Sequence, residues 1–176
     1  ALERLGLNGH GHALITMHRP GNVDDPGSLA RVAGLIRKVA ERFPVVFPVH
    51  PRTARNLQQH GLAEGLLNRP GITLCEPLGY FDFQKLVATS AVVITDSGGI
   101  QEETTFRRIP CLTLRPSTER PITITEGTNE LITFDLDELD RTLERIANGA
   151  FKQGKVPHLW DGHATERVVE ALMRWL

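Results

Sequence analysis

One stretch of the sequence decides the fold: Val92-Val93-Ile94-Thr95-Asp96-Ser97-Gly98-Gly99-Ile100-Gln101-Glu102-Glu103. Its first four residues are apolar or β-branched and predict a buried strand, and the residues from Gly99 to Arg107 predict a helix. A strand, a turn of small residues and a helix leave several backbone N–H groups unpaired at the positive end of the helix dipole. Glycines allow a phosphate to approach this backbone closely, and Ser97 can add a hydroxyl donor. The stretch therefore predicts a phosphate site at the start of the helix.

A second interpretation of this stretch is an ordinary capped helix, in which Gln101, Glu102 and Glu103 complement the dipole. The glycines match neither the G-x-G-x-x-G pattern nor a Walker motif with its lysine, so the stretch does not predict binding of a dinucleotide or of Mg-ATP. A carboxylate beside a diphosphate would repel it, so Glu103 is expected to accept hydrogen bonds from sugar hydroxyls if it contacts a ligand. The turn also lacks the G-x-S-x-G elbow of a serine hydrolase.

Similar apolar runs lie on both sides of this stretch and alternate with helical patterns. The predicted strands are residues 13–17, 45–49, 72–75, 92–95 and 111–114, with a weaker one at 131–133. The predicted helices are residues 29–40, 83–89, 99–107, 139–146 and 164–175, with a crossing loop at 154–162. Most of the strands lack alternation of apolar and polar residues, which is typical of strands covered on both faces. The pattern predicts one doubly wound, Rossmann-like α/β domain with a parallel sheet over residues 1–176.

Composition excludes several classes of function. The 176 residues are 40% hydrophobic and 23% charged, and their formal net charge is −1, so no excess of positive charge is present to hold a nucleic acid. The apolar runs are too short to span a bilayer. Cys75 and Cys111 lie in apolar runs and are interpreted as core residues of a protein in a reducing compartment, which predicts a cytoplasmic location. The chain begins at Ala1 without an initiator Met or a signal-like segment, so we expect it to be a piece of a longer protein.

Polar residues follow the predicted strands, at the edge of a parallel sheet where ligands bind. His18 is suited to donating to a phosphate or to moving a proton near neutral pH, although a structural histidine at this edge explains it equally. His50 is a weaker candidate, because Pro51 alone explains a turn there. Arg115 and Arg120 suit anion binding, although solvated arginines are also common. No metal site is expected, because the spacing of the five histidines in the first part of the chain matches no zinc signature; these five are His10, His12, His18, His50 and His60.

Taken together, these segments resemble the carboxyl-terminal half of the non-hydrolysing UDP-N-acetylglucosamine 2-epimerases, over essentially the whole chain. The resemblance is carried by Thr16-Met17-His18-Arg19-Pro20-Gly21-Asn22-Val23-Asp24-Asp25, Pro48-Val49-His50-Pro51, Glu76-Pro77-Leu78, Thr95 through Glu103, Arg115, Thr118-Glu119-Arg120-Pro121 and Glu126-Gly127-Thr128. It implies two Rossmann-type domains that face a cleft, as in the B-type glycosyltransferases. This chain would be the domain that holds UDP, and the other half of the cleft would come from the protein's own amino-terminal domain.

The resemblance also implies roles for particular residues. Ser97, Gly98 and Gly99 would bind the diphosphate, and Glu103 the ribose hydroxyls. Phe83 and the Leu78 backbone would flank uracil, although on sequence alone an aromatic on a helix face is more often a core residue. His18 and Arg120 would bind phosphate, with His18 the residue of this half expected to take part in catalysis. His50 would line the cleft near a second, activating UDP-sugar.

The implied reaction inverts C2 of the sugar in UDP-N-acetylglucosamine and gives UDP-N-acetylmannosamine. UDP leaves by elimination and adds back to a glycal, without a cofactor, in a pathway that makes cell-surface polysaccharide. The family's catalytic carboxylates belong to the amino-terminal domain, so this chain alone is not expected to be competent. Gly21 and Leu78 depart from the family pattern and weaken the contacts expected from their loops. A homodimer is a further expectation.

Other functions fit the same residues. A donor-binding domain of a UDP-sugar glycosyltransferase would share the architecture and the nucleotide site, but would require an acceptor. A hydrolysing epimerase would release free N-acetylmannosamine. A non-catalytic nucleotide-binding module is the third alternative, and it describes how this piece would behave in isolation.

Overall fold

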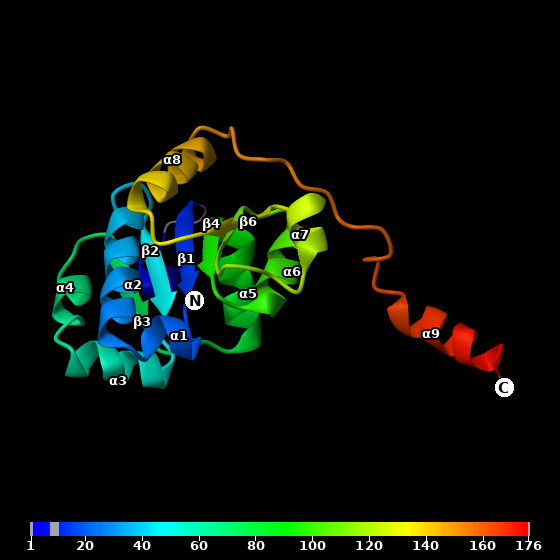
Figure 1. The fold of residues 1–176 in the computed structure, drawn as a ribbon, viewed down its shortest axis with the longest axis horizontal. Helices are drawn as coiled ribbons and strands as arrows, with labels where there is room; N and C mark the ends of the chain where they lie inside the picture. The colour runs from blue at the N-terminus through cyan, green and yellow to red at the C-terminus, as the bar shows by residue number, and fades with distance from the viewer. Residues whose placement is uncertain (1, 8–10, 176) are drawn as a thin grey trace.

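The computed structural model describes residues 2–7 and 11–175 and contains a sheet of six parallel strands (Figure 1). The strands are β1 (His12–Thr16), β2 (Val45–Pro48), β3 (Ile72–Cys75), β4 (Ser90–Thr95), β5 (Cys111–Leu114) and β6 (Asn129–Ile132). They lie in the order β3-β2-β1-β4-β5-β6, and every neighbouring pair is parallel. The predicted α/β class and parallel sheet are therefore confirmed.

Helices cover both faces of this sheet (Figure 1). They are the 3-10 helix η1 (Glu3–Leu5) and the α-helices α1 (Pro20–Val23), α2 (Pro26–Val39), α3 (Pro51–Gln59), α4 (Glu64–Leu67), α5 (Tyr80–Thr89), α6 (Gly98–Arg107), α7 (Pro121–Thr125), α8 (Leu136–Ala147) and α9 (Ala164–Met173). Successive strand residues point to opposite faces. In β1, Ala13 and Ile15 pack in one core cluster with residues of α2 and α8, whereas Leu14 packs in a second cluster with residues of α5. This two-sided packing is the doubly wound arrangement.

The strand order reverses between β1 and β4, which places the topological switch point at their carboxyl ends. From β1 the chain moves through β2 to β3 on one side, and from β4 it moves through β5 to β6 on the other. Thr16 of β1 is level with Thr95 of β4, and their hydroxyl oxygens are 2.6 Å apart. The loops after these two strands therefore diverge from adjacent points, and a ligand crevice is expected between such loops.

The structure corrects several predicted element bounds. Helix α5 begins at Tyr80, three residues before the predicted start, and β6 begins at Asn129 rather than at residue 131. Helices α3 and α7 were not predicted. In α3 only Thr53 and Leu57 are buried, so its sequence lacks a clear apolar face. Pro51, which was expected to explain a turn after His50, is the first residue of this nine-residue helix.

Both cysteines lie in strands, as predicted, and neither forms a disulfide. Cys111 is fully buried, and burial raises the pKa of its thiol to about 11. Cys75 is half-buried, and burial raises the pKa of its thiol as well. Both thiols are therefore held in the neutral form that suits a core position.

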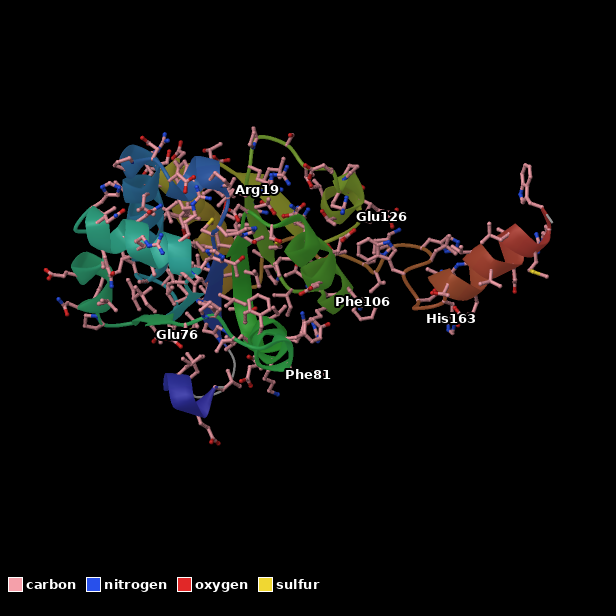
Figure 2. The ribbon with its side chains drawn as sticks, turned by 90° about the horizontal axis from the view of Figure 1, so that it is seen from below. Arg19, Glu76, Phe81, Phe106, Glu126 and His163 are labelled. Atoms are coloured by element: carbon pink, nitrogen blue, oxygen red, sulfur yellow. The ribbon has the colours of Figure 1, made fainter. Side chains whose placement is uncertain are left out.

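The last part of the chain extends away from the sheet. Figure 1 shows an extended segment that follows α8 and leads to α9, which lies well outside the body, and Figure 2 labels His163 beside this helix. No described residue of α9 is buried, and its apolar side chains are exposed: Val168, Val169, Leu172 and Met173, followed by Trp175. The predicted loop at 154–162 and the helix after it are confirmed. Among the described residues, no helix has the length and apolar character that crossing a membrane requires.

Candidate functional site at the switch point

A cavity of about 270 Å³ opens at the carboxyl ends of the central strands. It is lined by Thr16, Met17, His18, Pro48, His50, Pro77, Leu78, Phe83, Ser97 and Ile100. Five of the residues predicted from sequence are in this set: His18, His50, Leu78, Phe83 and Ser97. They come from loops after four different strands and from α5, so the fold gathers them although they are spread over 80 residues of sequence.

The first turn of α6 is open to this cavity. Ser97 is the N-cap residue, its backbone is extended (φ −90°, ψ 134°), and its side chain makes no capping hydrogen bond. Helices α2 and α8, in contrast, are capped by the side chains of Asp25 and Asp135. No acidic residue lies in the first turn of α6 either. Neither a capping side chain nor an acidic residue of the first turn therefore occupies the first amides of α6, which leaves them available to a ligand.

Gly98 and Gly99 are not required by the fold itself. Neither has a positive φ, and a Cβ built on either residue would meet no atom within 4 Å. Glycine is therefore needed here neither for backbone conformation nor for packing. The two residues leave open space directly over the first amides of α6, which is the space that a bound phosphate needs.

Asp96 joins the two loops that leave the switch point. Its side chain is fully buried, and its Oδ2 accepts hydrogen bonds from the backbone N–H groups of His18 (3.1 Å) and Arg19 (2.9 Å) and from Asn22 Nδ2 (3.0 Å). Its Oδ1 lies 3.0 Å from Nδ1 of His18. Asp96 belongs to the motif that predicted the phosphate site, but the sequence alone predicted no role for it. The feature that could have indicated a role is a carboxylate placed directly after a buried strand.

Glu103 lies one helical turn beyond Ile100, on the same face of α6, and does not line the cavity directly. Gln84 of α5 donates from Nε2 to Oε2 of Glu103 at 2.6 Å, and Arg107 donates from Nη2 to Oε1 of Gln84 at 2.9 Å. The Glu103 carboxylate is thus held in one orientation. Gln84 had not been identified as a site residue, because its partner is 19 positions away in sequence.

The two candidate arginines are each paired with a carboxylate of the chain. Arg120 lies 2.8 Å from Oε1 of Glu102 through Nε, and it does not line the cavity. Arg115 donates two hydrogen bonds to Glu119, and these hold the pKa of that carboxyl to about 2. Neither guanidinium is therefore a free cation, and a ligand would have to compete with the carboxylate.

Buried polar contacts fix the loop that carries Arg120. Thr118 donates to Oε1 of Gln101 at 2.6 Å, and Asn129 Nδ2 donates to the same oxygen at 3.1 Å. Gln101 in turn donates to the carbonyl of Ser97 at 3.3 Å. The glycine turn, Ser97 to Gly99, and the Arg120 loop are therefore joined through the fully buried side chain of Gln101.

The remaining predicted residues form the walls of the cavity. His50 is exposed and is the N-cap of α3, where its Nδ1 accepts the N–H of Arg52 at 3.2 Å. Leu78 and Phe83 are half-buried and pack against the second core cluster. Phe83 is therefore both a packing residue and part of the cavity wall. Gly21 lies in α1, and a Cβ there would meet no atom within 4 Å.

Two other features of the described residues bear on the site. A larger cavity, of about 670 Å³, opens between α3, α4 and β3 beside the edge of the sheet, and none of the predicted site residues lines it. No group of three or more histidine, cysteine, aspartate or glutamate side chains within residues 2–7 and 11–175 is placed to hold a metal ion. His10, which was among the histidines considered for metal binding, lies outside the described residues.

Comparison with known proteins places this site in a family. The family model described as UDP-N-acetylglucosamine 2-epimerase matches residues 2–173. The chain belongs to this epimerase family. It is 35% identical over 161 residues to the UDP-N-acetylglucosamine 2-epimerase of Methanocaldococcus jannaschii, an alignment that covers 90% of this chain and 43% of the relative. The chain spans less than half the length of the curated relatives it matches.

Solved structures agree with this assignment. The M. jannaschii enzyme in complex with UDP-GlcNAc and UDP superposes with a TM-score of 0.81 at 32% identity, over 94% of this chain and 46% of that one. The E. coli heptosyltransferase WaaC with ADP, which has the B-type glycosyltransferase fold, superposes with a TM-score of 0.54 at 15% identity, over 80% of this chain and 46% of that one. The second likeness shows the fold alone. The predicted family and the predicted likeness to one half of a B-type glycosyltransferase are both confirmed.

Proposed function

We propose that this epimerase-family chain is the UDP-binding half of an enzyme that interconverts UDP-N-acetylglucosamine and UDP-N-acetylmannosamine. One observation carries the proposal: the start of α6 has no capping side chain, and its two glycines leave open space over the first amides. This helix start lies at the cavity of the switch point, which His18 also lines. The M. jannaschii relative in complex with UDP-GlcNAc and UDP supports the identity of the ligand. The diphosphate would lie on the amides of Gly98 and Gly99, with Ser97 and His18 beside it.

The other residues of the site have proposed roles that follow from their positions. Leu78 and Phe83 supply an apolar wall against which uracil can pack. Glu103 accepts the ribose hydroxyls through the oxygen that Gln84 does not hold. Arg120 reaches the phosphate by exchanging its partner Glu102 for the ligand. His50 also lines the cavity and would contact a second nucleotide sugar.

The proposed mechanism is elimination of UDP followed by re-addition with the opposite configuration at C2. Negative charge develops on the departing diphosphate oxygen during the first step. The positive end of the α6 dipole and its free amides are aimed at that charge and would stabilise it. This half of the enzyme therefore holds the leaving group. The acid–base groups that act on C2 would belong to the other half, so we propose that this chain alone does not epimerise the sugar.

The proposed partner is the protein's own amino-terminal domain. Relatives are about twice as long as this chain, and α9 lies outside the body with its apolar side chains exposed, among them Val168, Leu172 and Met173 (Figure 1). Exposed apolar side chains that repeat along a helix are typical of an interface. We propose that α9 packs against the missing half. We further propose that the enzyme acts in the cytoplasm, in a pathway that makes cell-surface polysaccharide from nucleotide sugars.

Calorimetric titration with UDP tests the site. Ser97→Ala, Glu103→Ala and Arg120→Ala should each weaken binding; for the two charged residues a loss of about 1.5–3 kcal/mol, or roughly 10- to 150-fold, is expected. Arg69→Ala is a matched control for Arg120→Ala, because Arg69 is similarly exposed and also lies near a glutamate, Glu41. Unchanged affinity in all three variants would discard the site.

A UDP-sugar glycosyltransferase is the second candidate, favoured by the fold shared with the heptosyltransferase. Proton NMR of UDP-N-acetylglucosamine incubated with the longer protein that contains this chain separates the candidates. Conversion to the manno isomer without an acceptor supports the proposal. Release of free N-acetylmannosamine would indicate a hydrolysing epimerase, and turnover only when an acceptor sugar is present would indicate a transferase.

A further inference from the structure

The carboxylate of Asp96 is surrounded by hydrogen-bond donors. Its Oδ2 receives two backbone N–H groups and one side-chain amide, and its Oδ1 faces Nδ1 of His18 at 3.0 Å. The backbone amides and the Asn22 Nδ2 group can only donate, so they match an ionised carboxylate, which can only accept. The Asp96 side chain is fully buried, whereas that of His18 is 51% exposed. A buried anion thus holds one end of an imidazole whose remainder lies at the cavity.

This contact decides which nitrogen of His18 carries the hydrogen. Nδ1 must be protonated to donate to Oδ1 of Asp96. A neutral imidazole has one N–H group, so its Nε2 is then a bare acceptor. A diphosphate oxygen is also an acceptor, and two acceptors repel each other. Neutral His18 in this tautomer therefore cannot donate a hydrogen bond from Nε2 to a phosphate.

We propose that Asp96 is a positioning residue that fixes this tautomer, and that binding of a nucleoside diphosphate sugar draws one proton from solvent onto Nε2 of His18. The inference rests on the proposed function, because it concerns the same diphosphate. The imidazolium formed on binding donates from Nε2 to the diphosphate and from Nδ1 to Asp96. Both nitrogens of His18 then have a hydrogen-bond partner, and the buried carboxylate compensates the new charge.

Charged groups from each neighbouring element act on this equilibrium. Arg19 follows β1, and Arg115 follows β5, where its hydrogen bond to Glu119, and more weakly the charge of Asp96, raise the pKa of its guanidinium. The carboxylates of Asp96 and Glu119 oppose these two cations. His50, from the loop after β2, is the second imidazole that lines the cavity. The cations and carboxylates balance in the free chain, so the arriving diphosphate is the charge that shifts His18 toward the protonated form.

Calorimetry in buffers of different ionisation enthalpy measures the proton uptake directly. The probe is UDP-N-acetylglucosamine, because both of its phosphates are esterified and neither titrates near neutral pH. At pH 8 the chain should take up close to one proton per ligand bound, and the affinity should fall up to about tenfold per pH unit above neutrality. An enthalpy that is independent of the buffer, with affinity unchanged from pH 6 to pH 8.5, would overturn the inference.

Variants test whether the proton taken up on binding is carried by His18. His18→Gln places an amide N–H near the position of Nε2, so it should bind the ligand without proton uptake. Asp96→Asn should also lose the uptake, because the asparagine amide can donate to Nδ1 and leave the hydrogen on Nε2. His60→Gln is a control on the exposed C-cap of α3 and should behave as wild type. Uptake that is lost in His50→Gln but kept in His18→Gln would refute the assignment.

A second measurement separates this inference from the proposed function. Nitrogen-15 NMR of the free chain above pH 8 should show His18 with its hydrogen on Nδ1, and Asp96→Asn should shift it toward Nε2. A merely structural Asp96 would change stability without moving this signal. Failure of the chain to bind any uridine nucleotide would refute the proposed function, whereas an Nε2–H tautomer in wild type would refute the role of Asp96 even if UDP binds.

Discussion

Gln84 of α5 donates a 2.6 Å hydrogen bond to Glu103 of α6, and its side-chain oxygen accepts hydrogen bonds from the guanidinium of Arg107, one turn further along α6. The amide is buried, so it has little freedom to turn. Its oxygen is held by the Arg107 guanidinium, which forces its nitrogen toward Glu103. The carboxylate is therefore oriented before any ligand arrives, and such preorganisation lowers the entropic cost of binding.

Gln84→Leu should weaken UDP binding by about five- to tenfold, less than Glu103→Ala, because the variant removes only the hydrogen bond that orients the carboxylate before binding. Binding of 2′-deoxy-UDP should change much less, because the variant affects the group proposed to accept the ribose hydroxyls. Titration of both nucleotides checks this, with Gln59→Leu on exposed α3 as the control. An equal loss for the two nucleotides would show that Gln84 does not act through the ribose.

Gly99→Ala should separate binding from stability. A Cβ at this position meets no atom within 4 Å, and the backbone needs no positive φ, so the urea midpoint of unfolding should not fall. The new methyl group would occupy the space above the first amides of α6, so UDP affinity should fall at least tenfold. Unfolding curves and titration of one preparation give both values. Full UDP affinity in this variant would place the diphosphate elsewhere.

Gly127→Ala provides the opposite case. A Cβ there would overlap the Thr105 side chain and the carbonyl of Thr123, and both neighbours are buried. Overpacking of this kind costs about 1–3 kcal/mol. The urea midpoint should therefore fall clearly, in contrast to Gly99→Ala measured in the same series. A midpoint equal to that of wild type would mean that this close approach of α6 and α7 is not as the structure shows.

Asp140 predicts how stability depends on pH. Arg42 donates to it at 2.8 and 2.9 Å and Lys38 lies 3.4 Å away, and these contacts lower the pKa of its carboxyl to about 2. The lowered pKa stabilises the folded state at pH values above the ordinary value of 3.8, and this contribution is lost as the pH falls toward 2.

Asp140→Asn should therefore unfold at lower urea than wild type at pH 7, and the difference should shrink as the pH is lowered from 5 to 2. Added salt should reduce the difference at pH 7, because the pair lies near the surface. Urea unfolding at several pH values is the measurement. A difference that stays constant between pH 7 and pH 2.5 would show that the ion pair is not its cause.

The sheet could be predicted from sequence because its strands are continuous apolar runs. The run from Val92 to Thr95 is buried on both faces, so its apolar character and its short length were enough to predict a strand. The start of β6 was missed because Asn129 is polar, and only the structure shows it fully buried and bonded to Thr113 and Gln101. Helix α3 was missed because its buried side is limited to two residues.

The sequence predicted those residues of the candidate site that belong to a local motif. Ser97, Gly98 and Gly99 could be chosen because a strand, a small-residue turn and a helix follow one another in the sequence. Asp96 and Gln84 could not, because their roles depend on partners 78 and 19 positions away. Pairing across such distances is set by the strand order, and a single sequence does not contain it. The same limit applies to Arg120, whose partner Glu102 lies on another element.

The most direct test of the central claim is a backbone amide NMR titration of this chain with UDP. The account predicts that the amides of Ser97, Gly98, Gly99 and Ile100 shift most, together with the loop at His18. Shifts confined to residues around the larger cavity, such as Ala54, Leu57 and Leu67, or the absence of any shift at millimolar UDP, would contradict it.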